Sequence, residues 1–258
     1  MGVLKAVQQA TRRAPAIHKA IRAVWTPPER IYQHLYFDGT FSVEVECGAH
    51  FRLESHGEQA ENELFWRGYG EGWEGRSLVA WRELAKAATV IVDVGANTGI
   101  FALAAKAVNP DAKVVAIEPA RRVAEKLRRN VALNRWDIEI AECAASDFSG
   151  RATLYDHPGD HVYSASLETS MNGTIPIEVE VRRLDDMLER VDLVKMDVER
   201  HEPAALRGMR RLLETCRPTL LIEVLDDEAE AGIREALDGL VYAWERIDED
   251  RNVLLTPA

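Results

Sequence analysis

The chain has 258 residues, of which 47% are hydrophobic and 29% charged, as in ordinary soluble proteins. No apolar run approaches the roughly 20 residues that a membrane-spanning helix needs, and the net charge of −11 disfavours bulk binding to nucleic acid. The three cysteines lie far apart without a Cys-x-x-Cys pair, which argues against a cysteine zinc site and favours a reducing, cytoplasmic compartment. We expect no metal site.

Residues 1–29 are predicted to form a basic amphipathic helix. Apolar residues recur in steps of three and four along 1–25, and Pro15 is expected to break the helix after Ala14. Five of the 32 basic residues and none of the 43 acidic ones fall within residues 1–25. The pattern favours a helix packed on the body or on a second subunit of a homo-oligomer. Contact with a membrane surface, or a targeting peptide, is the alternative.

Residues 30–87 are predicted to form a small β appendage and a lead-in helix. Asp38-Gly39 is a hairpin signal, and the alternating run Phe41–Glu46 is expected to pair with Phe51–Leu53. Several glycines then surround Trp73 and Glu74, which indicates either a plain connector or a loop that brings Glu74 to a substrate. Residues 77–87 read as a helix.

Residues 88–258 alternate between strand and helix, as a doubly wound α/β sheet requires. The crossover 145–191 is longer than one helix needs, so we expect it to line the substrate side. A terminal hairpin, 241–247 with 252–255, would complete seven strands. The other predicted strands are 90–94, 113–118, 138–144, 192–197 and 218–224, and the predicted helices are 99–108, 119–133, 202–215 and 227–238.

The turn after the first of these strands is a candidate cofactor site. A strand, a glycine turn and a helix start place backbone N–H groups where an anionic ligand group can bind. Asp93 at the strand end would repel a pyrophosphate, whereas it would attract the ammonium of S-adenosylmethionine (SAM), whose carboxylate suits the N–H groups. The predicted cofactor-binding residues of the turn are Asp93, Gly95, Ala96, Asn97, Thr98 and Gly99.

An acid at the end of the second strand is the candidate ribose ligand. Glu118, followed by Pro119, stands 25 residues after Asp93, near the spacing of about 20 residues after the glycine turn that nucleotide-binding folds use. Its carboxylate would accept hydrogen bonds from both ribose hydroxyls.

Methyl transfer to an oxygen needs alignment, exclusion of water and removal of a hydroxyl proton. Asp197 lies at the end of the fourth strand, at the sheet edge where open α/β sheets bind ligands. Glu199 and His201 follow on the loop into a helix, and the three are the candidate catalytic residues. Glu199 can equally complement the helix dipole, and His201 can be incidental. Glu223 closes the next strand and is a candidate substrate-binding residue.

From about Glu61 to Glu223 the chain resembles the FkbM family of methyltransferases. The resemblance rests on several blocks in order. They are Asp93–Gly99, Glu118-Pro119, Asn130–Asn134, Leu184–Asp186, Val194–Glu202 and Arg217–Glu223. Asn97 is characteristic of the family. Arg200 departs from it, because glycine is usual there, and the backbone at Arg200 is expected to avoid positive φ or to be strained.

The resemblance implies a class I methyltransferase fold with SAM as cofactor. It implies that Ala145, Ser146 and Asp147, at the end of the third strand, contact the adenine, although Ser146 and Asp147 could simply be capping residues. It also implies a small-molecule hydroxyl acceptor such as a sugar, glycolipid or polyketide-type natural product. Two alternatives stay open: an NAD-dependent oxidoreductase on a Rossmann-like sheet, and a non-catalytic scaffold protein with a SAM-binding fold.

Overall fold

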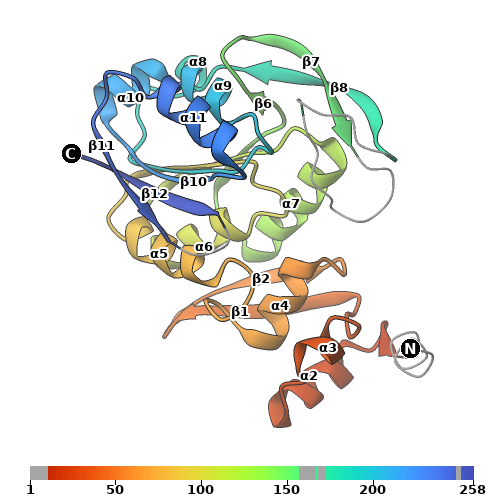
Figure 1. The fold of residues 1–258 in the computed structure, drawn as a ribbon. Coiled ribbons are helices and arrows are strands. Elements are labelled where there is room, and N and C mark those ends of the chain that lie inside the picture. The colour runs from red at the N-terminus through yellow and green to blue at the C-terminus, as the bar shows by residue number, and fades with distance from the viewer. Residues whose placement is uncertain (1–10, 157–166, 168–172, 248–250) are drawn as a thin grey trace.

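The structure is a computed structural model that describes residues 11–156, 167, 173–247 and 251–258. Its centre is a seven-stranded sheet in the order β11-β12-β10-β9-β3-β4-β5 (Figure 1). β12 is antiparallel to both of its neighbours, and the pairs formed by β3, β4, β5, β9 and β10 are parallel. The strands are β3 (Val90–Val94), β4 (Lys113–Ile117), β5 (Ile138–Ala141), β9 (Leu193–Met196), β10 (Thr219–Glu223), β11 (Tyr242–Arg246) and β12 (Asn252–Pro257).

This order confirms the predicted doubly wound, seven-stranded sheet. From β3 the chain continues to β4 and β5 on one side, and it later returns to β9 and β10 on the other. The strand order therefore reverses beside β3, and ligands of open α/β sheets bind at the carboxyl ends of the strands at such a point. Most residues of β3, β4 and β9 are apolar and buried, as expected for parallel strands that are covered on both faces.

Helices cover both faces of the sheet (Figure 1). On one face, helices α5 to α7 share a hydrophobic core that extends into the N-terminal β hairpin. On the other, α8 to α11 enclose a second core beneath β9 and β10. The helices are α5 (Gly75–Ala85), α6 (Ile100–Val108), α7 (Arg121–Asn134), α8 (Leu184–Met187), α9 (Glu202–Arg207), α10 (Arg210–Cys216) and α11 (Asp227–Ala236).

The N-terminal appendage consists of α2 (Pro15–Val24), α3 (Glu29–Tyr32), the hairpin β1 (Gly39–Glu46) with β2 (Ala49–Ser55), and α4 (Gln59–Arg67). Pro15 begins a helix after a break, as predicted. The predicted turn at Asp38-Gly39 is wrong: Gly39 begins β1, and the hairpin turns at Cys47-Gly48, where Gly48 has φ of +84°. The buried Asn130 of α7 anchors the hairpin, because its side chain accepts a hydrogen bond from the Glu54 N–H.

Two further differences concern the second half of the chain. The predicted strand 138–144 ends at Ala141, and Ala144-Ala145 (β6) joins a separate three-stranded sheet with β7 (Gly150–Asp156) and β8 (Ile175–Arg182). The predicted helix 202–215 divides into α9 and α10 at Gly208. A Cβ at Gly208 would overlap the Ser146 carbonyl oxygen, so the chain bends where its backbone meets another loop.

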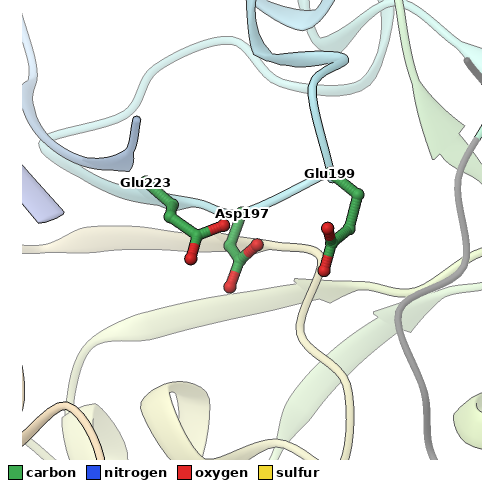
Figure 2. A group of neighbouring side chains, drawn as sticks. All are labelled: Asp197, Glu199 and Glu223. Atoms are coloured by element: carbon green, nitrogen blue, oxygen red, sulfur yellow. The ribbon is translucent and has the colours of Figure 1, made fainter. Parts of the chain in front are cut away.

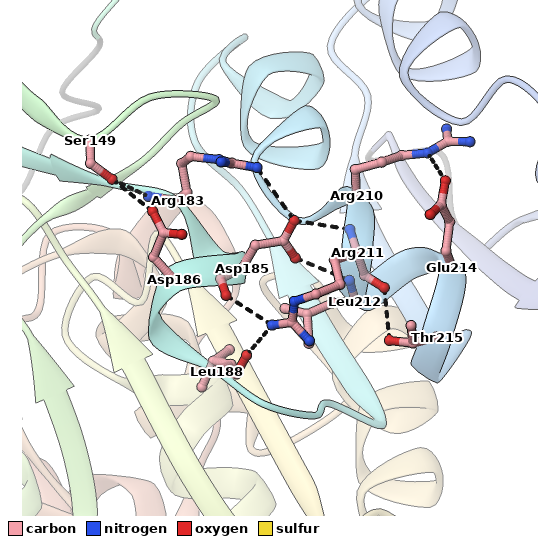
Figure 3. A network of polar contacts seen from close by, with 10 residues as sticks. All are labelled: Ser149, Arg183, Asp185, Asp186, Leu188, Arg210, Arg211, Leu212, Glu214 and Thr215. Atoms are coloured by element: carbon pink, nitrogen blue, oxygen red, sulfur yellow. Dashed lines mark hydrogen bonds and ion pairs between the residues drawn. The ribbon is translucent and has the colours of Figure 1, made fainter.

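The Leu184–Asp186 block has a structural role in this fold (Figure 3). The Asp185 carboxylate accepts hydrogen bonds from the backbone N–H groups of Arg211 (2.9 Å) and Leu212 (3.0 Å), so it caps the first turn of α10. The Arg211 guanidinium also donates a hydrogen bond to the Asp185 carbonyl oxygen. This network holds α8 against α10. The Leu184–Asp186 block does not line the cavity at the carboxyl edge of the sheet.

Candidate active site

A cavity of about 580 Å³ lies at the carboxyl ends of β3, β4 and β9. Its volume falls within the range of sites for small ligands and cofactors, about 300–1,000 Å³. The turn after β3 and the end of β4 form its floor, and Gly57–Glu61, at the start of α4, forms part of its wall. Further lining residues are Trp73, Phe101, Val123, Cys143, Ala144, Ala145, Leu154, Leu167, Lys195, Asp197, Glu199 and His201.

The turn after β3 is tightly folded. Gly95, Asn97 and Gly99 have φ of +80°, +52° and +96°. Asparagine tolerates this left-handed region better than most residues, which explains why it can occupy position 97. A Cβ at Gly95 would overlap the carbonyl oxygen of Asp197, so the turn lies directly against the loop after β9. The fold thereby joins the predicted cofactor turn to the predicted catalytic aspartate.

The amide groups of this turn are used differently from the prediction. The N–H groups of Gly95 and Ala96 donate to the Ile117 carbonyl oxygen at 3.0 and 2.9 Å, and that of Asn97 donates to Glu118. The Gly99 N–H donates to Ala96. Within the described residues only the Thr98 amide of the turn makes no hydrogen bond. The expected ring of N–H groups facing a ligand is therefore wrong, because four of these five donors are already bonded within the protein.

Asp93 is buried beneath the turn and lines the cavity. One of its carboxylate oxygens accepts a hydrogen bond from the Ala102 N–H of α6 at 2.9 Å. Burial raises the pKa of Asp93 to about 7, against the opposing attraction of the Lys195 ammonium. A cationic group entering the cavity would favour the ionised form of Asp93.

Glu118 closes β4 and faces the same cavity. Its two oxygens accept hydrogen bonds from Asn97 N–H (3.0 Å) and Ala120 N–H (2.9 Å), which fixes the orientation of the carboxylate. Each carboxylate oxygen has a second lone pair, so two ligand hydroxyls can still be accepted. Burial raises the pKa of Glu118 to about 7, although these two hydrogen bonds lower it. Pro119 also lines the cavity.

The predicted adenine contacts are only partly at the cavity. Ala145 lines it, together with Cys143 and Ala144. Ser146 is fully buried and bonds the His201 ring, and Asp147 pairs with Arg207 at 2.9 Å. Neither Ser146 nor Asp147 lines the cavity, so the structure gives them packing and pairing contacts in place of the predicted ligand contact. The residues that do line this end are apolar, as an adenine ring would require.

Three carboxylates gather at the carboxyl ends of β9 and β10 (Figure 2). Asp197 and Glu199 line the cavity, whereas Glu223, predicted to bind the substrate, does not. One oxygen from each of Asp197, Glu199 and Glu223 lies within 4.8 Å of the others. Carboxylates this close repel one another unless a proton or a cation offsets their charge. Burial first, and then the charge of Asp197, raises the pKa of Glu223 to about 9, so a proton held on Glu223 relieves the repulsion at neutral pH. These three acids could also ligate a divalent cation.

Sequence reasoning missed Lys195, whose ammonium is fully buried beside these acids. Its Nζ lies 3.8 Å from Asp197, 3.9 Å from Glu74 and 5.0 Å from the centre of the Phe101 ring. Burial alone would lower the pKa of Lys195, but the surrounding carboxylates, Glu74 first, outweigh it and raise the pKa. Lys195 therefore stays charged and stabilises ionised carboxylates at the carboxyl end of β9. The sequence held two signals for Lys195: a charged residue in a buried strand, and its place in the Val194–Glu202 block that resembles the family.

Three other predicted residues have different surroundings from those expected. Glu74 does not line the cavity. Its carboxylate accepts a hydrogen bond from Asn252 at 3.0 Å. His201 lines the cavity, but its Nε2 lies 2.9 Å from the Ser146 hydroxyl. Arg200 has φ of +77°, which is the second of the two expected outcomes, a non-glycine residue in the left-handed region. Its side chain pairs with Asp226 at the start of α11.

The buried acids predict an unusual dependence of stability on pH. With no ligand bound, the free energy of unfolding should fall between about pH 6.5 and 8.5. Burial raises the pKa of Asp93 and Glu118 to about 7 and that of Glu61 to about 8, so in this range the native state holds protons that the unfolded chain has released. For each proton that the native state holds and the unfolded chain does not, the free energy of unfolding falls by about 1.4 kcal/mol per pH unit. His56, with its pKa lowered to about 4, acts in the opposite sense only below about pH 6.5.

Urea unfolding across this pH range measures the slope. Glu61→Gln keeps the shape of the side chain without its titration, so the variant should show a shallower slope than the wild type. A free energy of unfolding that stays level or rises with pH would contradict the prediction.

Comparisons with known proteins match much of the chain. The model of the methyltransferase FkbM domain matches residues 93–246, which is more than half of the chain. The chain is 32% identical to 2-O-methyltransferase NoeI of Sinorhizobium fredii, over 60% of this chain and 72% of that protein. It is also 32% identical to methyltransferase sdnD of Sordaria araneosa, over 46% of this chain and 60% of that protein.

Among solved structures, the chain resembles methyltransferase FkbM of Methylobacillus flagellatus, with a TM-score of 0.46 and 22% identity, over 65% of this chain and 43% of that one. In the described part of the chain, every helix is too short or too polar to cross a membrane.

Proposed function

Because the chain belongs to the FkbM family of methyltransferases, we propose that it transfers a methyl group from SAM to a hydroxyl oxygen of a small molecule. The observation that carries the proposal is one cavity with a nucleoside-type end and an acidic end. Glu118 and an apolar wall lie at the first, and Asp197 lies at the second. The turn after β3 connects the two ends.

The residues of the cavity fit SAM by their chemistry. When bound, SAM supplies an electrophilic methyl carbon on its sulfonium sulfur. Glu118 would accept hydrogen bonds from the two ribose hydroxyls, with its orientation already set by two backbone N–H groups. Asp93 would pair with the ammonium of the amino-acid part, and Cys143, Ala144 and Leu154 would surround the adenine. A pyrophosphate at the turn after β3 would bring negative charge close to Asp93, which favours SAM over NAD.

At the acidic end, Asp197 would accept the proton of the acceptor hydroxyl as the methyl carbon is attacked. The charged Lys195 ammonium lies 3.8 Å from Asp197, and burial favours the protonated form of the neighbouring Glu223. Trp73 and Phe101, whose rings meet edge to face, help to exclude water from the cavity. Alignment and exclusion of water supply much of the acceleration in a displacement of this kind. Glu199 and His201 remain candidates for contacts with the acceptor.

The charge at this end also restricts the acceptor. The carboxylates of Asp197 and Glu199 would repel a phosphorylated or carboxylated molecule, whereas they can accept hydrogen bonds from neutral hydroxyls. We therefore propose a neutral, polyhydroxylated acceptor of the natural-product or sugar type. The 2-O-methyltransferase among the relatives is consistent with this class.

Ligand-dependent thermal unfolding tests the cofactor assignment. S-adenosylhomocysteine should raise the melting temperature by several degrees, since a ligand at 100 times its Kd stabilises a protein by about 2.7 kcal/mol. NADH at the same concentration should leave the melting temperature unchanged. Stabilisation by NADH alone would instead support an oxidoreductase.

Transfer of labelled methyl from SAM to a panel of neutral glycosides and hydroxylated polyketides then tests the reaction. Binding of S-adenosylhomocysteine without transfer to any acceptor class in the panel would favour a non-catalytic scaffold role.

A further inference from the structure

Helix α2 has an inner face that packs on the appendage. His18 is buried against Phe37 and Trp66, with ring centres 5.1 and 6.2 Å apart. The Arg22 guanidinium lies 5.1 Å from the centre of the Phe65 ring, and Ile21 joins the same hydrophobic core. These contacts fix the rotation of α2 about its axis, so its opposite side faces solvent.

The solvent-facing side of α2 is apolar. Ile17 and Val24, seven residues apart on one face of the helix, are 45% and 86% exposed, and Trp25 at the helix end is 51% exposed. The exposed residues Ala16, Ala20 and Ala23 lie between them at helical spacing. In the described residues, nothing packs over this outer face to account for its apolar character.

The charges around the outer face are positive. Arg13 and Lys19 are exposed, and neither forms an ion pair within the described part of the chain. No acidic residue occurs in 1–25, although the whole chain has a formal net charge of −11. A basic, apolar helix on an otherwise acidic protein is the charge pattern of a helix that lies in an anionic membrane surface.

We propose that the outer face of α2, comprising Ala16, Ile17, Ala20, Ala23, Val24 and Trp25, docks on an anionic lipid bilayer. The apolar side chains enter the headgroup region, Trp25 lies at the interface, and Arg13 and Lys19 contact lipid phosphates. A second copy of the chain is a weaker candidate. A ten-residue helix is about 15 Å long and 10 Å wide, which is far less area than the roughly 800 Å² per partner of a stable protein interface.

Helix α4 lies between α2 and the cavity. α4 connects them, because Phe65 and Trp66 of α4 contact α2 while Gly57–Glu61, at the other end of the same helix, lines the cavity. A bilayer that holds α2 would therefore bring the cavity near the lipid headgroups. The membrane proposal does not depend on methyl transfer and can be tested without any acceptor.

Cosedimentation of the full chain with vesicles tests the proposal. The protein should bind vesicles of phosphatidylcholine containing phosphatidylserine, and binding should weaken with salt and be at background with phosphatidylcholine alone. Val24→Glu with Trp25→Glu should reduce binding to background. Arg13→Gln with Lys19→Gln should weaken it roughly 20- to 30-fold, because each basic residue near an anionic surface contributes about fivefold.

Matched controls come from elsewhere on the surface. Val241 is 64% exposed on the edge of the main sheet, so Val241→Glu should leave vesicle binding unchanged. Lys113→Gln, which removes an exposed partner of Glu139, should also have no effect. Equal binding by the Val24→Glu, Trp25→Glu variant and the wild type would overturn the proposal. So would a concentration-dependent dimer in ultracentrifugation that the same two substitutions abolish.

Discussion

Replacing Glu118 by glutamine is expected to weaken binding of S-adenosylhomocysteine roughly 10- to 100-fold. Glu118 accepts hydrogen bonds from Asn97 and Ala120, one at each oxygen. A glutamine must place its NH₂ group against one of these N–H donors, and it also loses an acceptor for a ribose hydroxyl. An unsatisfied buried polar group costs about 1–3 kcal/mol, which corresponds to this range of affinity. Isothermal titration calorimetry measures the change.

Glu139→Gln serves as the control, since Glu139 lies on the neighbouring strand β5 in an exposed pair with Lys113. It should bind S-adenosylhomocysteine as the wild type does. A Kd for Glu118→Gln within threefold of the wild type, in a variant that melts normally, would remove Glu118 from the cofactor site.

Asp197→Asn is expected to lower kcat about 10²- to 10⁴-fold while the Kd for S-adenosylhomocysteine changes less than threefold. The loss of a general base has an effect of this size, and the substitution leaves the turn after β3 in place. Glu223→Gln is the matched control. A glutamine resembles a protonated glutamic acid in shape and charge, so a site in which Glu223 holds a proton should keep most of its activity at neutral pH.

Single-turnover transfer from labelled SAM separates chemistry from binding. Full activity of Asp197→Asn would show that another group takes the proton. The metal alternative has its own measurement: if EDTA abolishes wild-type activity and Mg²⁺ restores it, Asp197 acts as a metal ligand and not as the general base.

The sheet and its carboxyl edge could be predicted because the signals are local. Val90–Val94 is a short apolar run between turn residues, and the observed β3 has the predicted bounds. Asp93, Glu118 and Asp197 each end a buried strand, so parallel topology alone brings them to one edge. All three line the observed cavity.

The remainder of the site depends on long-range contacts that no local pattern records. The amides of Gly95 and Ala96 bond Ile117 of β4 and so do not face a ligand. Phe101, Glu74 and Asn252 surround the Lys195 ammonium, and they come from distant parts of the chain. Glu74, predicted at the substrate, instead receives the Asn252 side chain. Predicted contacts with the acceptor and the domain boundaries 1–29, 30–87 and 88–258 stay predictions.

The hydrogen bond between Asn252 and Glu74 joins residues 178 positions apart. Asn252 belongs to β12, which also supplies the antiparallel neighbour of β10. During synthesis on a ribosome, the pocket for the Lys195 ammonium cannot close until β12 has left the exit tunnel. A nascent chain that ends before β12 would leave that ammonium and its carboxylates without the Asn252 amide between them. The surroundings of the Lys195 ammonium are therefore completed only when β12 joins β10, and β11 can join the sheet only through β12.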